Sequence, residues 1–215
     1  NELIENLPIR DVDAYKNQFG HSMVIGGDHG FGGAAMMTAE AALRTGSGLV
    51  SMATRPAHVA GALARQPEVM VSGIVSGQEL EPLLVKPSVL IVGPGLGRSP
   101  WSEQLLQKAV ATGLPMVVDA DALNIIAEGR VVSQPDGSNW VMTPHPAEAA
   151  RLLNTSVAEV QADRFAAVRQ LQEKYNAVVL LKGAGTLIAA PGDEIIALCP
   201  YGNPGMATAG MGDVL

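Results

Sequence analysis

The sequence has a single cysteine, Cys199, and few aromatic residues, which make up 4% of the chain. One cysteine cannot form an internal disulfide, and no Cys/His cluster has the spacing of a zinc site. This cysteine usage fits a reducing compartment, so we expect a cytoplasmic protein. No apolar run approaches the roughly 18 residues that a membrane-spanning helix requires, which argues against a membrane protein.

Basic charge is also scarce. The formal net charge of the 215-residue chain is −7, and no basic run occurs. Such an acidic chain is a poor candidate for binding nucleic acid or an anionic membrane. An anionic ligand would have to be held locally, by main-chain amides and helix N-termini. The 24 glycines suit this, because glycine lets backbone approach backbone or a ligand closely.

Two nucleotide-binding patterns are missing, since neither G-x-G-x-x-G nor G-x-x-x-x-G-K-[ST] occurs. What is present is an alternation of short apolar, β-branched runs with helical stretches. This alternation predicts a three-layer α/β domain, with a mainly parallel central sheet and helices on both faces. The expected strands are Met23–Ile25, Leu49–Met52, Val69–Val71, Val89–Val92, Met116–Val118, Trp140–Met142 and Val178–Leu181, followed by a hairpin of Thr186–Ala190 and Ile195–Leu198.

Three helices are expected from periodicity: Ala34–Thr45, Trp101–Ala111 and Ser156–Tyr175. The last opens with Ser156-x-x-Glu159, a capping box. Its apolar residues recur at helical spacing and predict one continuous amphipathic helix. They are Val157, Val160, Phe165, Val168, Leu171 and Tyr175.

Ligands of parallel sheets bind beyond the carboxyl ends of the strands, so the loops that leave the strands are the candidate sites. Two of these loops are rich in glycine, Gly26–Gly33 and Gly93–Gly97. Both could present bare backbone to a ligand, or could be tight turns without one.

Polar residues follow the next strands. Asp119 and Asp121 could position a metal or a hydroxyl, or Asp121 could be an N-cap while Asp119 bonds a neighbouring loop. In Thr143–Glu148, Pro146 suits the first position of a helix, and Glu148 falls in that helix's first turn. The loop Lys182–Thr186 offers a cation, or is an ordinary hairpin turn.

The strongest signal is a run of small residues, 203–211, that leads into Gly212-Asp213. A Gly-x-Gly-Asp turn points several amides at one spot, which suits the anion that develops in phosphoryl transfer. An aspartate beside it can accept a proton from an attacking hydroxyl. The alternative is a simple N-cap aspartate before an apolar helix that begins with Val214 and Leu215.

These motifs, in this order, resemble the ADP/ATP-dependent NAD(P)H-hydrate dehydratase family of the ribokinase-like superfamily. The resemblance runs from about Gly20 to the last residue. The segments that carry it are Gly26–Ala35, Ala41–Val50, Val92–Gly97, Asp119–Asn124, Thr143–Glu148, Leu181–Thr186, Asn203–Ala207 and Gly210–Asp213.

The resemblance implies a ribokinase-like fold and a metabolite-repair reaction. The family phosphorylates the ring hydroxyl of the (S)-hydrate of NADH or NADPH and then eliminates phosphate. With ADP as the donor, the products are AMP, phosphate and the restored cofactor. ADP is the favoured donor, ATP the alternative, and Mg²⁺ is expected with the nucleotide.

The resemblance also implies roles for individual residues. Asp213 is the expected catalytic base, next to an anion hole of Gly210, Met211 and Gly212. The residues expected at the hydrated substrate are Ala34, Gly97, His145, Asn203 and Asp213. Those expected at the nucleotide are Lys182, Gly183, Ala184, Gly185, Thr186 and Gly212. Glu148 or Asp119 could reach Mg²⁺ through water.

The resemblance further favours a homo-oligomer. Residues 1–19 are expected to be a link or tail, as from an upstream NAD(P)H-hydrate epimerase domain, and residues 20–215 the dehydratase domain. That domain is expected to be C-terminally incomplete, since the family continues past Asp213. Two rival functions remain: a kinase acting on a vitamin-precursor alcohol, and a non-catalytic nucleotide-binding fragment. His145 favours the dehydratase, because the pyrimidine kinases of the superfamily tend to have asparagine there.

Overall fold

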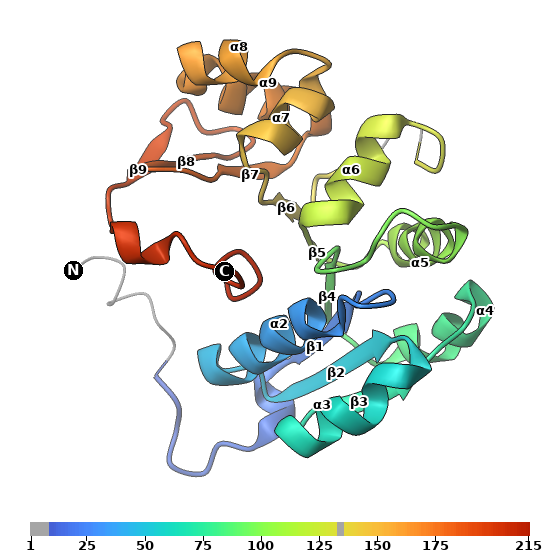
Figure 1. The fold of residues 1–215 in the computed structure, drawn as a ribbon. Helices are drawn as coiled ribbons and strands as arrows, with labels where there is room; N and C mark the ends of the chain where they lie inside the picture. Colours follow the sequence, from blue (N-terminus) through green and yellow to red (C-terminus); the bar gives the residue numbers. More distant parts are fainter. Residues whose placement is uncertain (1–8, 133–135) are drawn as a thin grey trace.

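The computed structural model describes residues 9–132 and 136–215, and within them nine strands form one sheet (Figure 1). The strand order is β3-β2-β1-β4-β5-β6-β7-β8-β9. Strands β1 to β7 are parallel to one another. Strand β8 pairs with β7 in the antiparallel direction, and β9 pairs with β8 in the same way. The bounds are β1 His21–Ile25, β2 Leu49–Thr54, β3 Met70–Gly73, β4 Val89–Val92, β5 Met116–Val118, β6 Trp140–Met142, β7 Val178–Leu181, β8 Thr186–Ala189 and β9 Ala197–Cys199. The predicted mainly parallel sheet with a C-terminal hairpin is confirmed.

Helices cover the sheet on two faces. They are α2 Gly32–Thr45, α3 Val59–Arg65, α4 Gly77–Leu80, α5 Pro100–Ala111, α6 Ala120–Glu128, α7 Pro146–Leu153, α8 Val157–Ala162 and α9 Arg164–Tyr175. Short 3₁₀ turns add η1 Lys16–Phe19, η2 Pro56–His58, η3 Glu81–Val85 and η4 Pro204–Met206. No helix in the two described ranges combines the length and apolarity needed to cross a membrane.

Alternating side chains of the strands build a core on each face, since successive residues of a strand point to opposite sides. On β1, Val24 packs with residues of α2 and α3, while Met23 and Ile25 face the larger core under α4, α5, α6, α7 and α9. Both faces are therefore apolar, as buried parallel strands require. The predicted three-layer architecture is confirmed.

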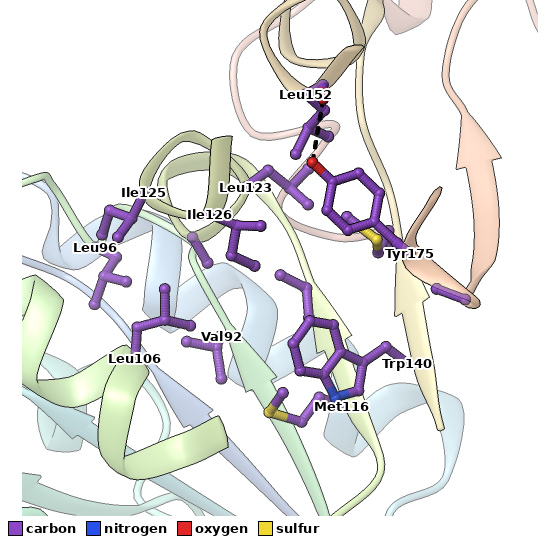
Figure 2. Close-up of a cluster of buried hydrophobic side chains, with 14 of the residues drawn as sticks. Val92, Leu96, Leu106, Met116, Leu123, Ile125, Ile126, Trp140, Leu152 and Tyr175 are labelled. Carbon is purple, nitrogen blue, oxygen red and sulfur yellow. Dashed lines mark hydrogen bonds between the residues drawn. The ribbon is translucent and has the colours of Figure 1, made fainter. Parts of the chain in front are cut away.

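The larger core is dominated by bulky side chains from β5, β6 and the helices above them (Figure 2). Trp140 and Met116 lie under α6, with Leu123 fully buried. Tyr175 at the end of α9 donates its hydroxyl to the carbonyl of Leu152, 3.1 Å away, so its one polar atom is satisfied. Burial raises the pKa of Tyr175 to about 12.

The strand order reverses direction at β1, which places the loops after β1 and β4 next to each other. From β1 the chain moves outward to β2 and β3 on one side, then returns to β4 on the other side. A crevice opens at such a switch point, beyond the carboxyl ends of the two strands. The two glycine-rich loops, 26–33 and 93–97, leave the sheet at this place.

The prediction of one helix from Ser156 to Tyr175 is wrong. Asp163 leaves helical geometry with φ −145° and ψ 86°, and its side chain caps α9 by accepting the N–H of Ala166 at 2.9 Å. The break turns Val157 and Phe165 to the surface, with exposures of 44% and 54%. The sequence period hid this break because a capping aspartate looks like any polar residue on a helix face.

Several smaller predictions also shift. Strand β3 begins one residue later than the predicted Val69, and β9 lies at 197–199 instead of 195–198. Residues 209–214 form turns, and the apolar helix expected to begin with Val214 and Leu215 stays a prediction. The division at residue 19 stays a prediction, and residues 1–8 of that segment lie outside the described residues.

We expect Leu123→Ala to lower the free energy of unfolding by about 2–5 kcal/mol, because it removes a fully buried side chain and leaves a cavity. Urea unfolding followed by circular dichroism measures this loss. Leu63→Ala is the control: Leu63 is 41% exposed, so its change should stay within about 0.5 kcal/mol. Equal losses in the two variants would contradict this description of the core.

Candidate active site

Two glycine-rich loops at the carboxyl edge of the sheet are joined through their backbones. The N–H of Gly27 donates to the carbonyl of Pro94 at 3.0 Å, and the N–H of Asp28 donates to that of Gly95 at 2.6 Å. A Cβ on Gly26 would lie 2.1 Å from the Pro94 oxygen, closer than any side chain tolerates. The glycines of these loops are therefore needed for the approach of backbone to backbone.

Asp28 anchors this loop cluster. Its carboxylate accepts hydrogen bonds from Arg55 Nε at 2.7 Å and Ser99 Oγ at 3.2 Å. Burial by itself would raise the pKa of Asp28, but these donors, Arg55 above all, bring that pKa below its ordinary value. The Arg55 guanidinium stacks on Trp101, with Cζ 4.0 Å from the ring centroid. Arg55 was not among the site residues expected from the sequence. The one sign of its role there is a charged residue at the end of an apolar strand.

The predicted roles of the two aspartates in Asp119–Asn124 are partly wrong. Asp119, not Asp121, occupies the N-cap position of α6, and its side chain makes no capping bond. As expected, Asp119 does bond neighbouring loops: its Oδ1 accepts from Thr143 Oγ1 at 2.6 Å and from Lys182 Nζ at 2.7 Å. Asp121 instead accepts the N–H of Gly97 at 2.9 Å. The amide of Gly97 is thereby occupied.

Lys182 connects the expected nucleotide-binding loop, residues 182–186, with Asp119. It begins the β7–β8 hairpin, and its ammonium pairs with the buried Asp119. A Cβ on Gly212 would lie 3.9 Å from Lys182 Nζ, so the turn before Asp213 faces the same ammonium. Arg164, also missed from the sequence, braces the hairpin by donating to the carbonyls of Leu181 and Ala184 at 3.1 Å and 3.0 Å.

Asp213 is held against α2 by its backbone. Its carbonyl accepts the hydroxyl of Thr38 at 2.7 Å, which joins residues 175 apart in the sequence. The N–H groups of the three preceding residues, 210–212, donate to no acceptor within the described part of the chain. Gly210 has φ +89°, and successive free amides in such a turn form an anion-binding nest.

Neighbouring charges tune Asp213 in opposite directions. Burial raises the pKa of Asp213, the negative charge of Asp119 raises it further, and the positive charge of Lys182 opposes both. The net shift is upward. A raised pKa makes Asp213 a stronger base, which suits a group that accepts a proton from a hydroxyl.

His145 and Glu148 form a reciprocal cap at the start of α7, as Pro146 and Glu148 predict. His145 Nδ1 accepts the N–H groups of Ala147 and Glu148 at 3.1 Å and 3.3 Å, so the neutral ring carries its proton on Nε2. That nitrogen lies 3.2 Å from Glu148 Oε1. Burial lowers the pKa of His145, assisted by Lys182, and burial raises the pKa of Glu148.

The structure therefore gathers some of the predicted site residues and leaves others apart. Lys182, Asp119, Gly212 and Asp213 share one electrostatic cluster. Ala34 lies in the first turn of α2, one helical turn before Thr38. Asn203 is exposed and caps η4 by accepting the N–H of Gly205 at 2.9 Å. Its hydrogen bonds in the described residues do not reach that cluster.

Two carboxylates, those of Asp119 and Glu148, are the expected metal ligands near Lys182. Within the described ranges, no three His, Cys, Asp or Glu side chains group closely enough to hold a metal ion by themselves. The negative charge of Asp119 helps to raise the pKa of Glu148, so the two carboxylates belong to one neighbourhood of the site. Such a pair suits Mg²⁺, which binds one or two carboxylates, waters and nucleotide phosphates.

A family model described as NAD(P)H-hydrate dehydratase matches residues 22–215. The chain belongs to this family. It is 53% identical over 211 residues to a bifunctional NAD(P)H-hydrate repair enzyme from Coxiella burnetii, covering 97% of this chain and 42% of that protein. It is 42% identical to the ADP-dependent (S)-NAD(P)H-hydrate dehydratase of Neisseria meningitidis, covering 96% of this chain and 70% of that one.

The chain spans about two fifths of the bifunctional relatives, with 42% of the Coxiella and 39% of the Escherichia coli protein covered. Solved structures agree on the fold. A ribokinase-like protein from Enterococcus faecalis superposes with a TM-score of 0.84 at 31% identity, covering 96% of this chain and 72% of that one. The ADP/ATP-dependent dehydratase of Bacillus subtilis, co-crystallised with ATP and Mg²⁺, gives 0.81 at 24% identity, covering 97% and 73%. The fold is ribokinase-like, as expected.

We expect the two charges beside Asp213 to move its titration in opposite directions. A carboxylate base is active when ionised, so activity falls as the pH drops through its pKa. Lys182→Gln removes a positive charge and should move the acid limb of kcat/KM to higher pH by roughly 0.5–1 unit; Asp119→Asn should move it to lower pH by a similar amount.

The control is Thr143→Val, which removes the hydroxyl on Asp119 without changing any charge. Its acid limb should stay in place. Shifts of the same sign in Lys182→Gln and Asp119→Asn would show that the limb does not report Asp213.

Proposed function

We propose that this chain carries out the nucleotide-dependent dehydration of the (S)-hydrate of NADH or NADPH, a metabolite-repair reaction. The observation that carries the proposal is the turn at residues 210–213, where three free amides precede a carboxylate of raised pKa. Membership of the dehydratase family and the name of the Neisseria relative support the substrate. ADP is the proposed phosphoryl donor, and AMP and phosphate are the products.

In the first step Asp213 takes the proton of the ring hydroxyl, and that oxygen attacks the terminal phosphorus of ADP. The bond from phosphorus to the bridging oxygen breaks, and AMP leaves. The amides of Gly210, Met211 and Gly212 are proposed to donate to the phosphoryl oxygens and so to stabilise their negative charge. Lys182 faces the same turn, and with residues 183–186 it is proposed to hold the nucleotide.

In the second step the carbon–oxygen bond breaks and phosphate departs. The lone pair of the ring nitrogen expels the phosphate, and the neighbouring ring carbon then loses a proton, which restores the reduced ring. Phosphorylation is needed because hydroxide is a far poorer leaving group than phosphate. The proton that Asp213 accepted is released to water between turnovers.

His145 is proposed to contact the hydrate, together with Ala34, Gly97 and Asn203. The proton on Nε2 makes the neutral ring of His145 a donor, so it can bond a carbonyl oxygen of the substrate. Glu148 and the helix amides fix the ring plane. Mg²⁺, when bound, neutralises charge on the nucleotide phosphates, and Asp119 and Glu148 would reach it through water.

The bifunctional relatives suggest a partner activity. Their name pairs two repair functions, so we infer that this chain works with an NAD(P)H-hydrate epimerase, in the same polypeptide or beside it. A homo-oligomeric state and a cytoplasmic location stay predictions.

The test is a spectroscopic assay on the full-length protein with NADPH hydrate, Mg²⁺, and ADP or ATP. Reduced nicotinamide absorbs near-ultraviolet light that the hydrate does not, so repair appears as rising absorbance. A nucleotide-dependent rise is expected, and the larger rise identifies the donor. Binding of nucleotide without any rise would overturn the proposal and favour a small-molecule kinase.

We expect Asp213→Asn to reduce kcat by at least about a hundredfold, because an amide cannot accept the hydroxyl proton. Nucleotide affinity, measured by calorimetry, should be nearly unchanged because the backbone amides remain. Asp193→Asn is a matched control on an exposed loop, and it should turn over normally. Near-normal turnover of Asp213→Asn would remove Asp213 from the role of base.

A further inference from the structure

A hollow lies around the N-terminal end of α2, on the side that faces η2 and α3. It is a cavity of about 470 Å³, lined among others by Gly33, Met36, His58, Gly61 and Arg65. None of these residues has a part in the phosphoryl transfer or the elimination described above.

The glycines of this cavity differ from those of the interlocked loops. A Cβ built on Gly33 or Gly61 would meet no atom within 4 Å, so no protein neighbour requires glycine at these positions. Gly61 even lies inside a helix, where glycine costs about 0.5–1 kcal/mol relative to alanine. Small residues here keep the cavity open and leave bare backbone along its wall.

The hydrogen bonds of His58 determine what it can offer a ligand. The hydroxyl of Thr54 donates its only proton to the carbonyl of Gly27 at 2.8 Å. Its contact with His58 Nδ1 at 3.1 Å must therefore be an N–H of the histidine donating to the hydroxyl oxygen. The neutral ring then has its lone pair on Nε2, which can accept a hydrogen bond from a ribose hydroxyl or an amino group.

The charge at the cavity is positive. Arg65 and Arg44 both bond the carboxylate of Glu40, at 2.8 Å and 2.7 Å. Hydrogen bonds from Arg65 and then Arg44 lower the pKa of Glu40, so the carboxylate is ionised and the three charges sum to +1. The first-turn N–H groups of the 14-residue helix α2 add partial positive charge at the same end.

The cavity lies beside the proposed site of reaction, because both border the first turns of α2. Gly32 and Gly33 line it, and Ala34, proposed to contact the hydrate, is the next residue of the same turn. Thr38, which holds the backbone of Asp213, lies four residues further, or about 6 Å along the helix axis. A substrate with its ring at Asp213 can extend around the start of α2 into this cavity.

We propose that this cavity binds the adenosine diphosphate ribose half of the hydrated dinucleotide. His58 accepts a hydrogen bond from the nucleoside, the glycine backbone and Met36 contact its flat and apolar parts, and Arg65 attracts a phosphate. The inference rests on the proposed function, and it adds the site that binds the part of the substrate remote from the reacting ring.

The first test compares Arg65→Gln with Arg44→Gln in the full-length protein. Both remove a guanidinium from Glu40, but only Arg65 lines the cavity. Arg65→Gln should raise KM for the dinucleotide hydrate roughly five- to tenfold with kcat unchanged, the size expected for a charged hydrogen bond at a partly exposed site. Arg44→Gln removes the same charge but leaves the cavity wall intact, so it should raise KM much less than Arg65→Gln does, with kcat unchanged.

Three substrates identify the group that Arg65 contacts. An increase in KM with both NADH hydrate and NADPH hydrate indicates the pyrophosphate, and an increase with NADPH hydrate alone indicates the 2′-phosphate. The hydrate of reduced nicotinamide mononucleotide lacks the adenosine half, so its KM should not change. An equal increase with all three substrates, or with none, overturns the inference.

The second test fills the cavity without disturbing the fold. Gly61→Leu places a side chain into open space within a helix, and it should keep or raise the free energy of unfolding. It should raise KM for both dinucleotide hydrates at least fivefold and leave the mononucleotide hydrate unaffected. Unchanged KM for the dinucleotides in a folded Gly61→Leu protein contradicts the proposal.

A direct binding measurement separates this inference from the proposed function. With AMP saturating the nucleotide loop, ADP-ribose should bind the unsubstituted protein in calorimetry, and Gly61→Leu should weaken that binding. This result with no turnover of any hydrate would retain the cavity and reject the dehydratase activity. Turnover with ADP-ribose binding unaffected by Gly61→Leu would reject the cavity and retain the activity.

Discussion

The position of the candidate site depends on the close contact among the backbones of three loops at the carboxyl edge of the sheet. A Cβ on Gly93 would lie 1.8 Å from the carbonyl oxygen of Asp119, and one on Gly95 would lie 2.6 Å from that of Phe31. Only glycine lets the loops after β1, β4 and β5 approach this closely. Two of these loops lead into α2 and α6. Helix α2 carries Thr38, whose hydroxyl donates to the carbonyl of Asp213, and α6 has Asp119 as its N-cap.

Charge at the site depends on this geometry. Asp119 is 6% exposed and is stabilised there by Lys182 and Thr143, since a buried carboxylate without partners would be costly. The same Lys182 limits how far the pKa of Asp213 rises. One ammonium therefore offsets part of the charge of two carboxylates, and the three groups together keep a net negative charge when both carboxylates are ionised.

The arrangement on α2 would let one helix contact both halves of the proposed dinucleotide substrate. Its first turn has glycine at positions 32 and 33, with Ala34 next. One side of the turn borders the cavity of His58 and Arg65, and Thr38 reaches the turn that contains Asp213. A dinucleotide has a reactive ring at one end and an anionic nucleoside at the other, so it matches a helix that offers a separate surface to each.

The sequence by itself determined the layer architecture, the strands and the order of the loops, because short β-branched apolar runs and helical stretches are local properties. It also indicated Asp213, Lys182 and His145 as candidate site residues, because the motifs that contain them are short and continuous in the sequence. Tertiary structure alone decided the break at Asp163, the exchange of roles between Asp119 and Asp121, and the parts of Arg55 and Arg164. The cavity lined by Arg65 could also be found only from the tertiary structure. Apart from the local cap at Asp163, the contacts of these side chains join groups 17 to 63 residues apart in the sequence, and only the folded sheet sets the distances between them.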